Sequence, residues 1–146
     1  MEKLKGIVSQ YSAAIVYDPQ NNEVDINTAA FPLIGFEKTI VIPPKKNSDP
    51  FAWASKCSAE FVGQNACIFI PGRKFDLSGT RHGRGGGWFD RFLSQVPAGW
   101  MRIGVARSPD ISKKLLKRET WDEPVDWLLV QNELNWVAFE TKARSR

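Results

Sequence analysis

The segment of this sequence best suited to chemistry is a glycine-rich stretch flanked by charged residues. Its four glycines are Gly83, Gly85, Gly86 and Gly87. Glycine adopts positive φ angles and lets the backbone come close to a ligand, so successive N–H groups in such a loop can surround a phosphate. Arg81 and Arg84 supply cations for phosphate oxygens. Asp90 supplies a carboxylate of the kind that Mg²⁺ prefers, so the stretch suits a phosphorylated ligand and a metal ion.

The same residues have a plainer interpretation, which their types alone leave open. Glycines also serve turns in exposed loops, and the stretch matches neither of the two common phosphate signatures. It lacks the Lys-Ser/Thr ending of a P-loop, and Trp88 stands where a dinucleotide-binding fold needs its third glycine. Asp90 could equally be an acid favoured in the first turn of a helix. The glycines therefore do not decide by themselves between a phosphate loop and a surface turn.

Short apolar runs that alternate with helical segments must position this loop. Strands are expected at Ala13–Tyr17, Thr39–Ile42, Ala66–Ile70, Met101–Ala106, Val125–Val130 and Trp136–Phe139, and helices at Thr28–Phe36, Phe51–Phe61, Trp88–Gln95 and Ile111–Arg118. Such alternation is typical of a largely parallel sheet flanked by helices, in which ligands bind beyond the carboxyl ends of the strands. We expect an α/β, single-domain three-layer sandwich over residues 1–141, followed by a basic tail at 142–146.

Composition excludes several other classes of protein. The chain has 146 residues, which fit one domain, and 42% of them are apolar, as in a globular protein. No apolar run approaches the roughly 20 residues of a membrane span, and the first residues lack the apolar stretch of a signal peptide, so we expect a cytoplasmic protein. Three of the cations behind the net charge of +4 lie in the tail. The charge of the domain therefore does not predict a nucleic-acid partner.

A longer pattern around the loop carries a family resemblance. Residues 75–91 read Phe-Asp-Leu-Ser-Gly-Thr-Arg-His-Gly-Arg-Gly-Gly-Gly-Trp-Phe-Asp-Arg. They resemble the signature of the 5-formyltetrahydrofolate cyclo-ligases: Phe-Asp, two residues, Gly, any, Arg-Leu-Gly, any, Gly, any, Gly-Tyr-Tyr-Asp-Arg. The segments Glu23–Asp25, Met101–Ala106 and Asp122–Asp126 also agree with the family pattern. The resemblance runs from about Glu23 to Asn132.

The resemblance implies ATP-dependent cyclisation of 5-formyltetrahydrofolate to 5,10-methenyltetrahydrofolate with Mg²⁺. By that resemblance Arg81 and Arg84 take catalytic roles, and Asp90 and Asp122 bind the metal. The implied ATP site comprises Arg81, Gly83, Arg84, Gly85, Gly86, Gly87, Trp88 and Phe89. The implied folate site comprises Glu23, Arg84, Gly85, Gly86, Gly87 and Trp88. From the residues alone, Glu23 could also be an exposed turn residue, and Asp122 could merely cap the start of a strand.

Several positions depart from the family pattern. His82 replaces a leucine, Trp88-Phe89 replaces two tyrosines, and Trp121 replaces a histidine. We do not expect the family's usual long N-terminal helix in this sequence, nor do we expect Lys3 or Lys5 to replace its cations. Two alternatives to the cyclo-ligase therefore stay open. One is a paralog that binds nucleotide or phosphate but acts on another substrate. The other is a non-catalytic module that binds RNA or an acidic partner through Arg84, Arg107 and the basic face at 113–118, with exposed aromatics such as Trp121. That basic face could also be the solvated surface of a helix.

Overall fold

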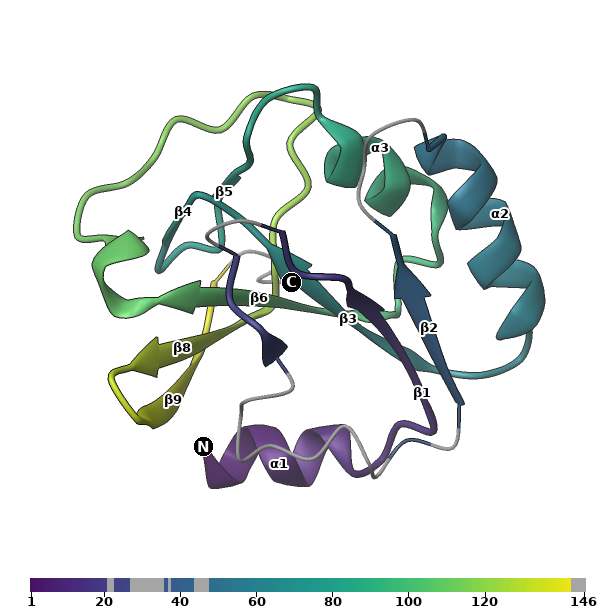
Figure 1. Cartoon of the computed structure of the whole chain (residues 1–146), viewed down its shortest axis with the longest axis horizontal. Helices are drawn as coiled ribbons and strands as arrows, with labels where there is room; N and C mark the ends of the chain where they lie inside the picture. Colours follow the sequence, from purple (N-terminus) through teal and green to yellow (C-terminus); the bar gives the residue numbers. More distant parts are fainter. Residues whose placement is uncertain (21–22, 27–35, 37, 44–47, 143–146) are drawn as a thin grey trace.

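A six-stranded sheet forms the centre of the molecule (Figure 1). The computed structural model describes residues 1–20, 23–26, 36, 38–43 and 48–142. The strands of the sheet are β1 (Ala13–Tyr17), β2 (Lys38–Ile42), β3 (Ala66–Pro71), β6 (Met101–Arg107), β8 (Trp127–Asn132) and β9 (Asn135–Glu140). They are ordered β2-β1-β3-β6-β8-β9, and all neighbours pair in parallel except β8 and β9. The predicted, largely parallel sheet is confirmed.

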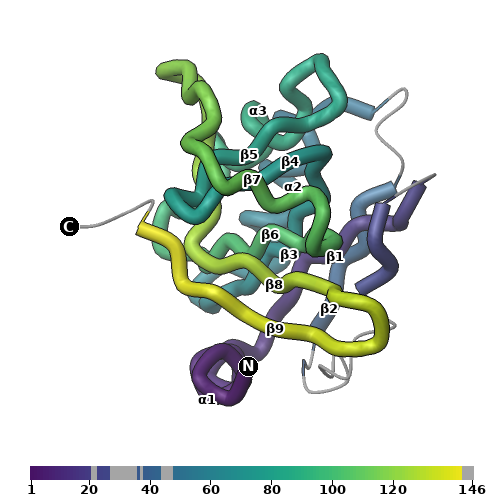
Figure 2. The backbone as a smooth tube through the Cα atoms, turned by 90° about the vertical axis from the view of Figure 1, so that its left-hand side faces the viewer, coloured from purple at the N-terminus to yellow at the C-terminus, as the bar shows by residue number. Residues whose placement is uncertain are grey.

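Helices cover both faces of this sheet. Helices α2 (Pro50–Glu60) and α3 (Trp88–Gln95) pack together on one face, and α1 (Glu2–Val8) lies on the other. Figure 2 shows the molecule from another side, with α1 below the strands of the large sheet and α3 above them. Every residue of β1 and β3 is buried, as a parallel strand covered on both faces requires. The continuous apolar run of Ala66–Ile70 therefore predicted its position correctly.

The two helices beside the glycine loop begin in different ways. Asp49 caps α2 by accepting a hydrogen bond from the Phe51 N–H (2.9 Å), and Pro50 occupies the first turn. Helix α3 begins after Gly87, whose φ of 64° is left-handed, and no side chain caps it. The first turn of α3 therefore lacks the side-chain cap that Asp49 gives to α2.

The N-terminal segment differs from the sequence prediction, because a seven-residue helix, α1, precedes β1. Its buried residues are Leu4 and Val8. Lys3 pairs with Glu140 of β9 (3.5 Å), and Lys5 pairs with Glu2 (3.7 Å). Both lysines thus belong to the face of the sheet opposite α3 (Figure 1), in agreement with the expectation that neither reaches the glycine loop.

A second, three-stranded sheet carries the start of the signature. Its strands are β4 (Lys74–Asp76), β5 (Arg81–His82) and β7 (Ile111–Ser112), in the order β5-β4-β7. The Phe75 side chain is fully buried and lies against Gly72 and Gly104. A Cβ atom added to Gly72 would lie 2.8 Å from the Phe75 ring, and one added to Gly104 would lie 2.5 Å from it. These two glycines therefore make room for the ring that joins the small sheet to β6.

The predicted basic helix at Ile111–Arg118 is wrong. A 3₁₀ turn, η3 (Ser108–Asp110), leads into β7, and residues 113–119 continue without helix or strand. In a helix, Lys113 would face Lys117, and Lys114 would face Arg118, as like-charge pairs four residues apart. Here Asp76 accepts a hydrogen bond from the Leu116 N–H (2.7 Å) instead. The segment is an extended strap, residues 113–119, held by the hairpin beneath it.

The remaining sequence predictions fare as follows. The six strands of the large sheet and the helices α2 and α3 lie within two residues of their expected bounds, whereas the short strands β4, β5 and β7 were not expected. The helix expected at Thr28–Phe36 falls outside the described residues, apart from Phe36. Within the described part of the chain, none of the helices has the length and apolar character that a membrane crossing requires.

Candidate functional site

The glycine loop reaches the carboxyl edge of the large sheet through a hairpin. After β3, the chain forms β4, a turn and β5, and the loop Gly83–Gly87 then leads into α3. Asp76 closes the turn, because its carboxylate accepts hydrogen bonds from the N–H groups of Ser78 (2.9 Å) and Thr80 (3.0 Å). Burial raises the pKa of Asp76, but these hydrogen bonds and that from Leu116 outweigh burial and lower it. The Phe-Asp pair of the signature is therefore structural.

Three consecutive residues of the loop have left-handed backbones. The φ angles of Gly85, Gly86 and Gly87 are 98°, 79° and 64°, and an added Cβ would meet nothing within 4 Å at any of them. Glycine is required there by backbone conformation and not by crowding. At Gly83 the requirement is space, since an added Cβ would lie 3.0 Å from the Arg81 guanidinium. The loop thus combines exposed N–H groups with close access to a cation.

Arg81 is a buried cation at the base of the loop. Only 5% of its surface is exposed, and its Nε donates to the Pro71 carbonyl (2.6 Å). Its guanidinium lies 5.1 Å from the centre of the Phe89 ring, which is itself buried. Burial lowers the pKa of Arg81 to about 10, while the carboxylates of Asp90, Glu23 and Asp122 act in the opposite direction. The side chain therefore stays charged at neutral pH and faces acidic groups.

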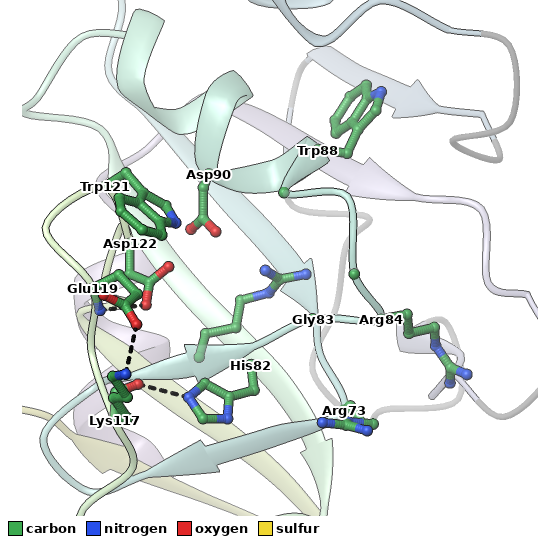
Figure 3. Close-up of a pocket in the computed structure, with 13 residues that line it drawn as sticks. Arg73, His82, Gly83, Arg84, Trp88, Asp90, Lys117, Glu119, Trp121 and Asp122 are labelled. Atoms are coloured by element: carbon green, nitrogen blue, oxygen red, sulfur yellow. Dashed lines mark hydrogen bonds and ion pairs between the residues drawn. The ribbon is translucent and has the colours of Figure 1, made fainter.

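Two of these carboxylates line the same pocket (Figure 3). Asp90 lies in the first turn of α3, and its Oδ1 accepts the Glu123 N–H (3.0 Å). Asp122 comes from the loop before β8, and its Oδ2 accepts the Glu119 N–H (2.8 Å). Burial raises the pKa of Asp90, and the negative charges of Asp122 and Glu123 raise it further. The hydrogen bond from the Glu123 N–H and the charge of Arg81 act in the opposite direction. A cation between the two aspartates would oppose this rise in the pKa of Asp90.

The pocket has a volume of about 420 Å³. Its cationic side chains are Arg73, Arg81, Arg84 and Lys117, and its acidic ones are Asp90, Glu119 and Asp122. Figure 3 shows that Arg73 and Arg84 lie on the side away from Glu119 and Asp122, whereas Lys117 lies beside Glu119. A ligand with phosphate groups and a bound divalent cation matches this arrangement, because each of its parts meets the opposite charge.

Glu23 is brought to the loop from far away in the sequence. Its carboxylate lies 3.9 Å from Arg84 Nε, and its side chain is only 7% exposed. It also accepts a hydrogen bond from the Gln20 N–H (2.9 Å). Glu23 is thus not an exposed turn residue. Its role toward a ligand stays a prediction, supported by its place beside the loop.

The aromatic pair of the signature is largely buried. Trp88 stacks on Phe92 with ring centres 5.5 Å apart, and its indole N–H donates to the Ser48 carbonyl (3.1 Å). It still forms part of the pocket wall. The buried ring of Phe89 supports Arg81 from below. Contact of either ring with ATP or folate stays a prediction.

Sequence reasoning missed several residues of the pocket wall. Arg73, Lys117 and Glu119 line the pocket, although the sequence placed Lys117 on a solvated helix. The carbonyl of Lys117 accepts a hydrogen bond from His82 Nε2 (2.7 Å), and its Nζ pairs with Glu119 (3.1 Å). The strap of residues 113–119 is thereby fixed beside β5. Only the position of Arg73, just after β3, signalled its place in advance.

Arg102 was also missed, and it lies behind the acidic side of the pocket. Its guanidinium donates to the carbonyls of Leu93, in α3, and Pro124 (both 3.2 Å), and it pairs with Glu123 (3.5 Å). It is buried in β6. Since the Glu123 N–H binds Asp90, Arg102 holds the backbone that orients this carboxylate.

The fold and the pocket define an α/β domain with a site for an anionic ligand at the carboxyl edge of its sheet. A family model, the 5-formyltetrahydrofolate cyclo-ligase family, matches residues 45–131, and the chain belongs to this family. The expected family membership is confirmed.

Two solved structures share this fold. A 5,10-methenyltetrahydrofolate synthetase from Mycoplasma pneumoniae is 22% identical with a TM-score of 0.56, and covers 88% of this chain and 79% of its own. The NMR structure of the Aquifex aeolicus 5,10-methenyltetrahydrofolate synthetase is 24% identical with a TM-score of 0.57, and covers 99% and 82%. No curated protein sequence matches the chain.

Proposed function

We propose that this protein catalyses the ATP-dependent cyclisation of 5-formyltetrahydrofolate to 5,10-methenyltetrahydrofolate. Membership of the cyclo-ligase family supports this reaction. The observation that carries the proposal for this chain is the buried Arg81, which faces Asp90 and Asp122 across a pocket rimmed by left-handed glycines. Such a pocket offers cations and N–H groups to a triphosphate and carboxylates to its metal ion.

In this reaction the formyl oxygen takes the γ-phosphoryl group of ATP, and ADP leaves. N10 then attacks the formyl carbon, the ring closes and phosphate leaves. The protein positions the reactants and stabilises charge on the phosphoryl oxygens. Arg81, fixed by the Pro71 carbonyl, holds those oxygens without having to reorganise, and Arg84 approaches them from the side of the pocket away from Asp122.

The residues present suit Mg²⁺. The described part of the chain holds no cluster of three or more His, Cys, Asp or Glu side chains that would cage a metal. Mg²⁺ commonly uses only one or two carboxylates and completes its shell with water and substrate phosphates. Asp90 and Asp122 would supply those carboxylates. When bound, the ion would neutralise phosphate charge.

We assign the folate to the side of the pocket where Glu23 lies beside Arg84. A pterin presents N–H donors, which a carboxylate accepts well. Glu23 is nearly buried and already oriented by the Gln20 N–H and Arg84. Arg84 would therefore lie between the two ligands, next to the formyl group and the γ-phosphate.

One observation favours a second candidate, a paralog that binds nucleotide but acts on another substrate. Trp88 and Phe89 replace the two tyrosines of the family signature, and both rings are buried. Compared with the family signature, the start of α3 therefore lacks two hydroxyl groups. If those hydroxyls are needed for the folate, nucleotide binding survives and cyclisation does not.

Calorimetric titration with Mg-ATP, followed by 5-formyltetrahydrofolate on the same sample, separates the two functions. Absorbance of the methenyl product, formed only with both ligands and metal, supports the cyclo-ligase. Nucleotide binding without product identifies the paralog. Arg81→Met should lower Mg-ATP affinity by at least about 10-fold, because it removes a charge-assisted contact. An unchanged affinity would exclude the proposed phosphate site.

A further inference from the structure

Trp121 is an exposed aromatic residue on a closed turn at the rim of the pocket. The turn Glu119–Asp122 is closed twice, by the Asp122 N–H to the Glu119 carbonyl (3.1 Å) and by the Glu119 N–H to the Asp122 carboxylate (2.8 Å). The Trp121 side chain is nevertheless 67% exposed. The fold therefore presents a large apolar ring to solvent from a backbone held in place.

The same ring also lines a second hollow, of about 660 Å³. It shares Gly87, Asp90 and Trp121 with the pocket described above. Its other residues are Gly86, Arg91, Ser94, Thr120 and Glu123. The two hollows thus meet at one wall, made of the last loop glycine, a candidate metal ligand and an exposed indole.

This arrangement fits a ligand with phosphates at one end and a flat aromatic ring at the other. We propose that Trp121 stacks against the purine base of the nucleotide, with the base in the second hollow and the phosphates in the first. The inference rests on the proposed function, since it assigns the nucleotide's phosphates to Arg81 and the glycine loop. The metal ion at Asp90 would then lie on the shared wall, next to the phosphates.

The pterin, the second flat ligand of the proposed reaction, is assigned to a place away from Trp121. Glu23, the partner proposed for the pterin, contacts Arg84. Figure 3 shows Arg84 and Trp121 on opposite sides of the pocket, with Trp121 beside Asp90. A nucleotide base on Trp121 and a pterin at Glu23 leave the phosphates between them, where phosphoryl transfer has to occur.

The test compares two ligands with the same number of phosphates, of which only one carries a nucleoside. Mg-ATP carries the purine, and Mg-tripolyphosphate carries the phosphates alone. Calorimetry on Trp121→Ala should show Mg-ATP affinity reduced by about 10-fold, which lies within the range for loss of a stacking partner. Affinity for tripolyphosphate should not change. Trp121→Phe, which keeps a ring, should restore most of the loss.

The matched control is Leu115→Ala, which removes another exposed apolar side chain (81% exposed) from the neighbouring strap and should leave both affinities unchanged. Equal thermal unfolding of all variants would confirm that the fold is intact. Unchanged Mg-ATP affinity in Trp121→Ala overturns the inference alone. Weaker 5-formyltetrahydrofolate binding with normal Mg-ATP binding also overturns it, and assigns the ring to the pterin. Wild-type protein that binds neither phosphate ligand overturns the proposed function as well.

Discussion

At the scale of single residues, burial opposes the charges of two side chains of the site, Arg81 and Asp90. Burial lowers the pKa of Arg81 to about 10 and raises the pKa of Asp90. Each group partly offsets this effect in the other, because their charges are opposite. Ionisation of Asp90 therefore costs folding stability in the unliganded protein, and a cation bound beside it would offset that cost.

Asp90→Asn should stabilise the unliganded protein at neutral pH and abolish metal-dependent nucleotide binding. A carboxyl whose pKa is raised on folding binds its proton more tightly in the folded state. Its ionisation therefore lowers the free energy of unfolding as pH rises from its ordinary range through the raised pKa. Asparagine avoids this loss and can still accept the Glu123 N–H.

The measurement is thermal unfolding of both proteins at several pH values, without ligand. The advantage of Asp90→Asn should grow as pH rises through that window and then become constant. Calorimetry with Mg-ATP supplies the second readout. A variant that is less stable than wild type at neutral pH would contradict the proposed strain at Asp90.

At the scale of elements, the glycine loop and the loop before β8 are held by different physical means. The first depends on backbone conformation, since its last three residues are left-handed. The second depends on a buried cation, Arg102, which joins it to α3. Gly85 and Gly87 line the pocket themselves, whereas Arg102 is not among its lining residues and acts through the backbone of Glu123. Loss of Arg102 should therefore change ligand affinity indirectly.

Gly87→Ala should weaken both the fold and the phosphate site. A left-handed backbone costs a residue with a Cβ roughly 1–2 kcal/mol, although open space surrounds this position. Relief of that strain would move the loop and lower Mg-tripolyphosphate affinity. Gly99→Ala is the matched control, because Gly99 also has open space around it but lacks a left-handed backbone. Equal effects of the two substitutions would exclude a conformational role for Gly87.

Arg102→Met should lower the free energy of unfolding by about 3 kcal/mol, because it leaves Glu123 and two carbonyl groups without their cation. Mg-ATP affinity should fall too, since the Glu123 backbone orients Asp90. Ile15→Ala, in the buried centre of β1, should cost a similar free energy by leaving a cavity. Urea unfolding and calorimetry on both variants separate the effects. If Ile15→Ala weakens Mg-ATP binding equally, Arg102 supports the fold and not the site.

At the scale of the whole molecule, the sequence predicted those features that depend on local pattern. The apolar run Ala66–Ile70 specified a strand buried on both faces, and Trp88–Gln95 matched α3. Contacts between distant segments decided the rest. The basic segment 111–118 has a local pattern that resembles a helix. In the structure, its backbone and side chains instead form hydrogen bonds with Asp76, Thr80 and His82. Arg73 and Lys117 line the pocket because their backbones are hydrogen-bonded to His82, a contact between segments that local periodicity does not predict.

The joint between the two sheets is the long-range contact that most directly places the site. Phe75 fills the space above Gly72 and Gly104, and the hairpin that it anchors carries Arg81. Gly104→Ala should lower the free energy of unfolding by about 2 kcal/mol, because its Cβ would lie 2.5 Å from the Phe75 ring. Phe75→Leu removes that ring but leaves a gap.

A double-mutant cycle measured by urea unfolding tests the joint. The pair Phe75→Leu/Gly104→Ala should cost less than the sum of the two single substitutions, since the added methyl group meets a smaller side chain. The hairpin of Gly104→Ala should also shift, so its Mg-tripolyphosphate affinity should fall and recover in part in the double variant. Additive free energies would mean that the ring and the glycine are not coupled. The position of Arg81 would then depend on its bond to the Pro71 carbonyl rather than on the packing of the two sheets.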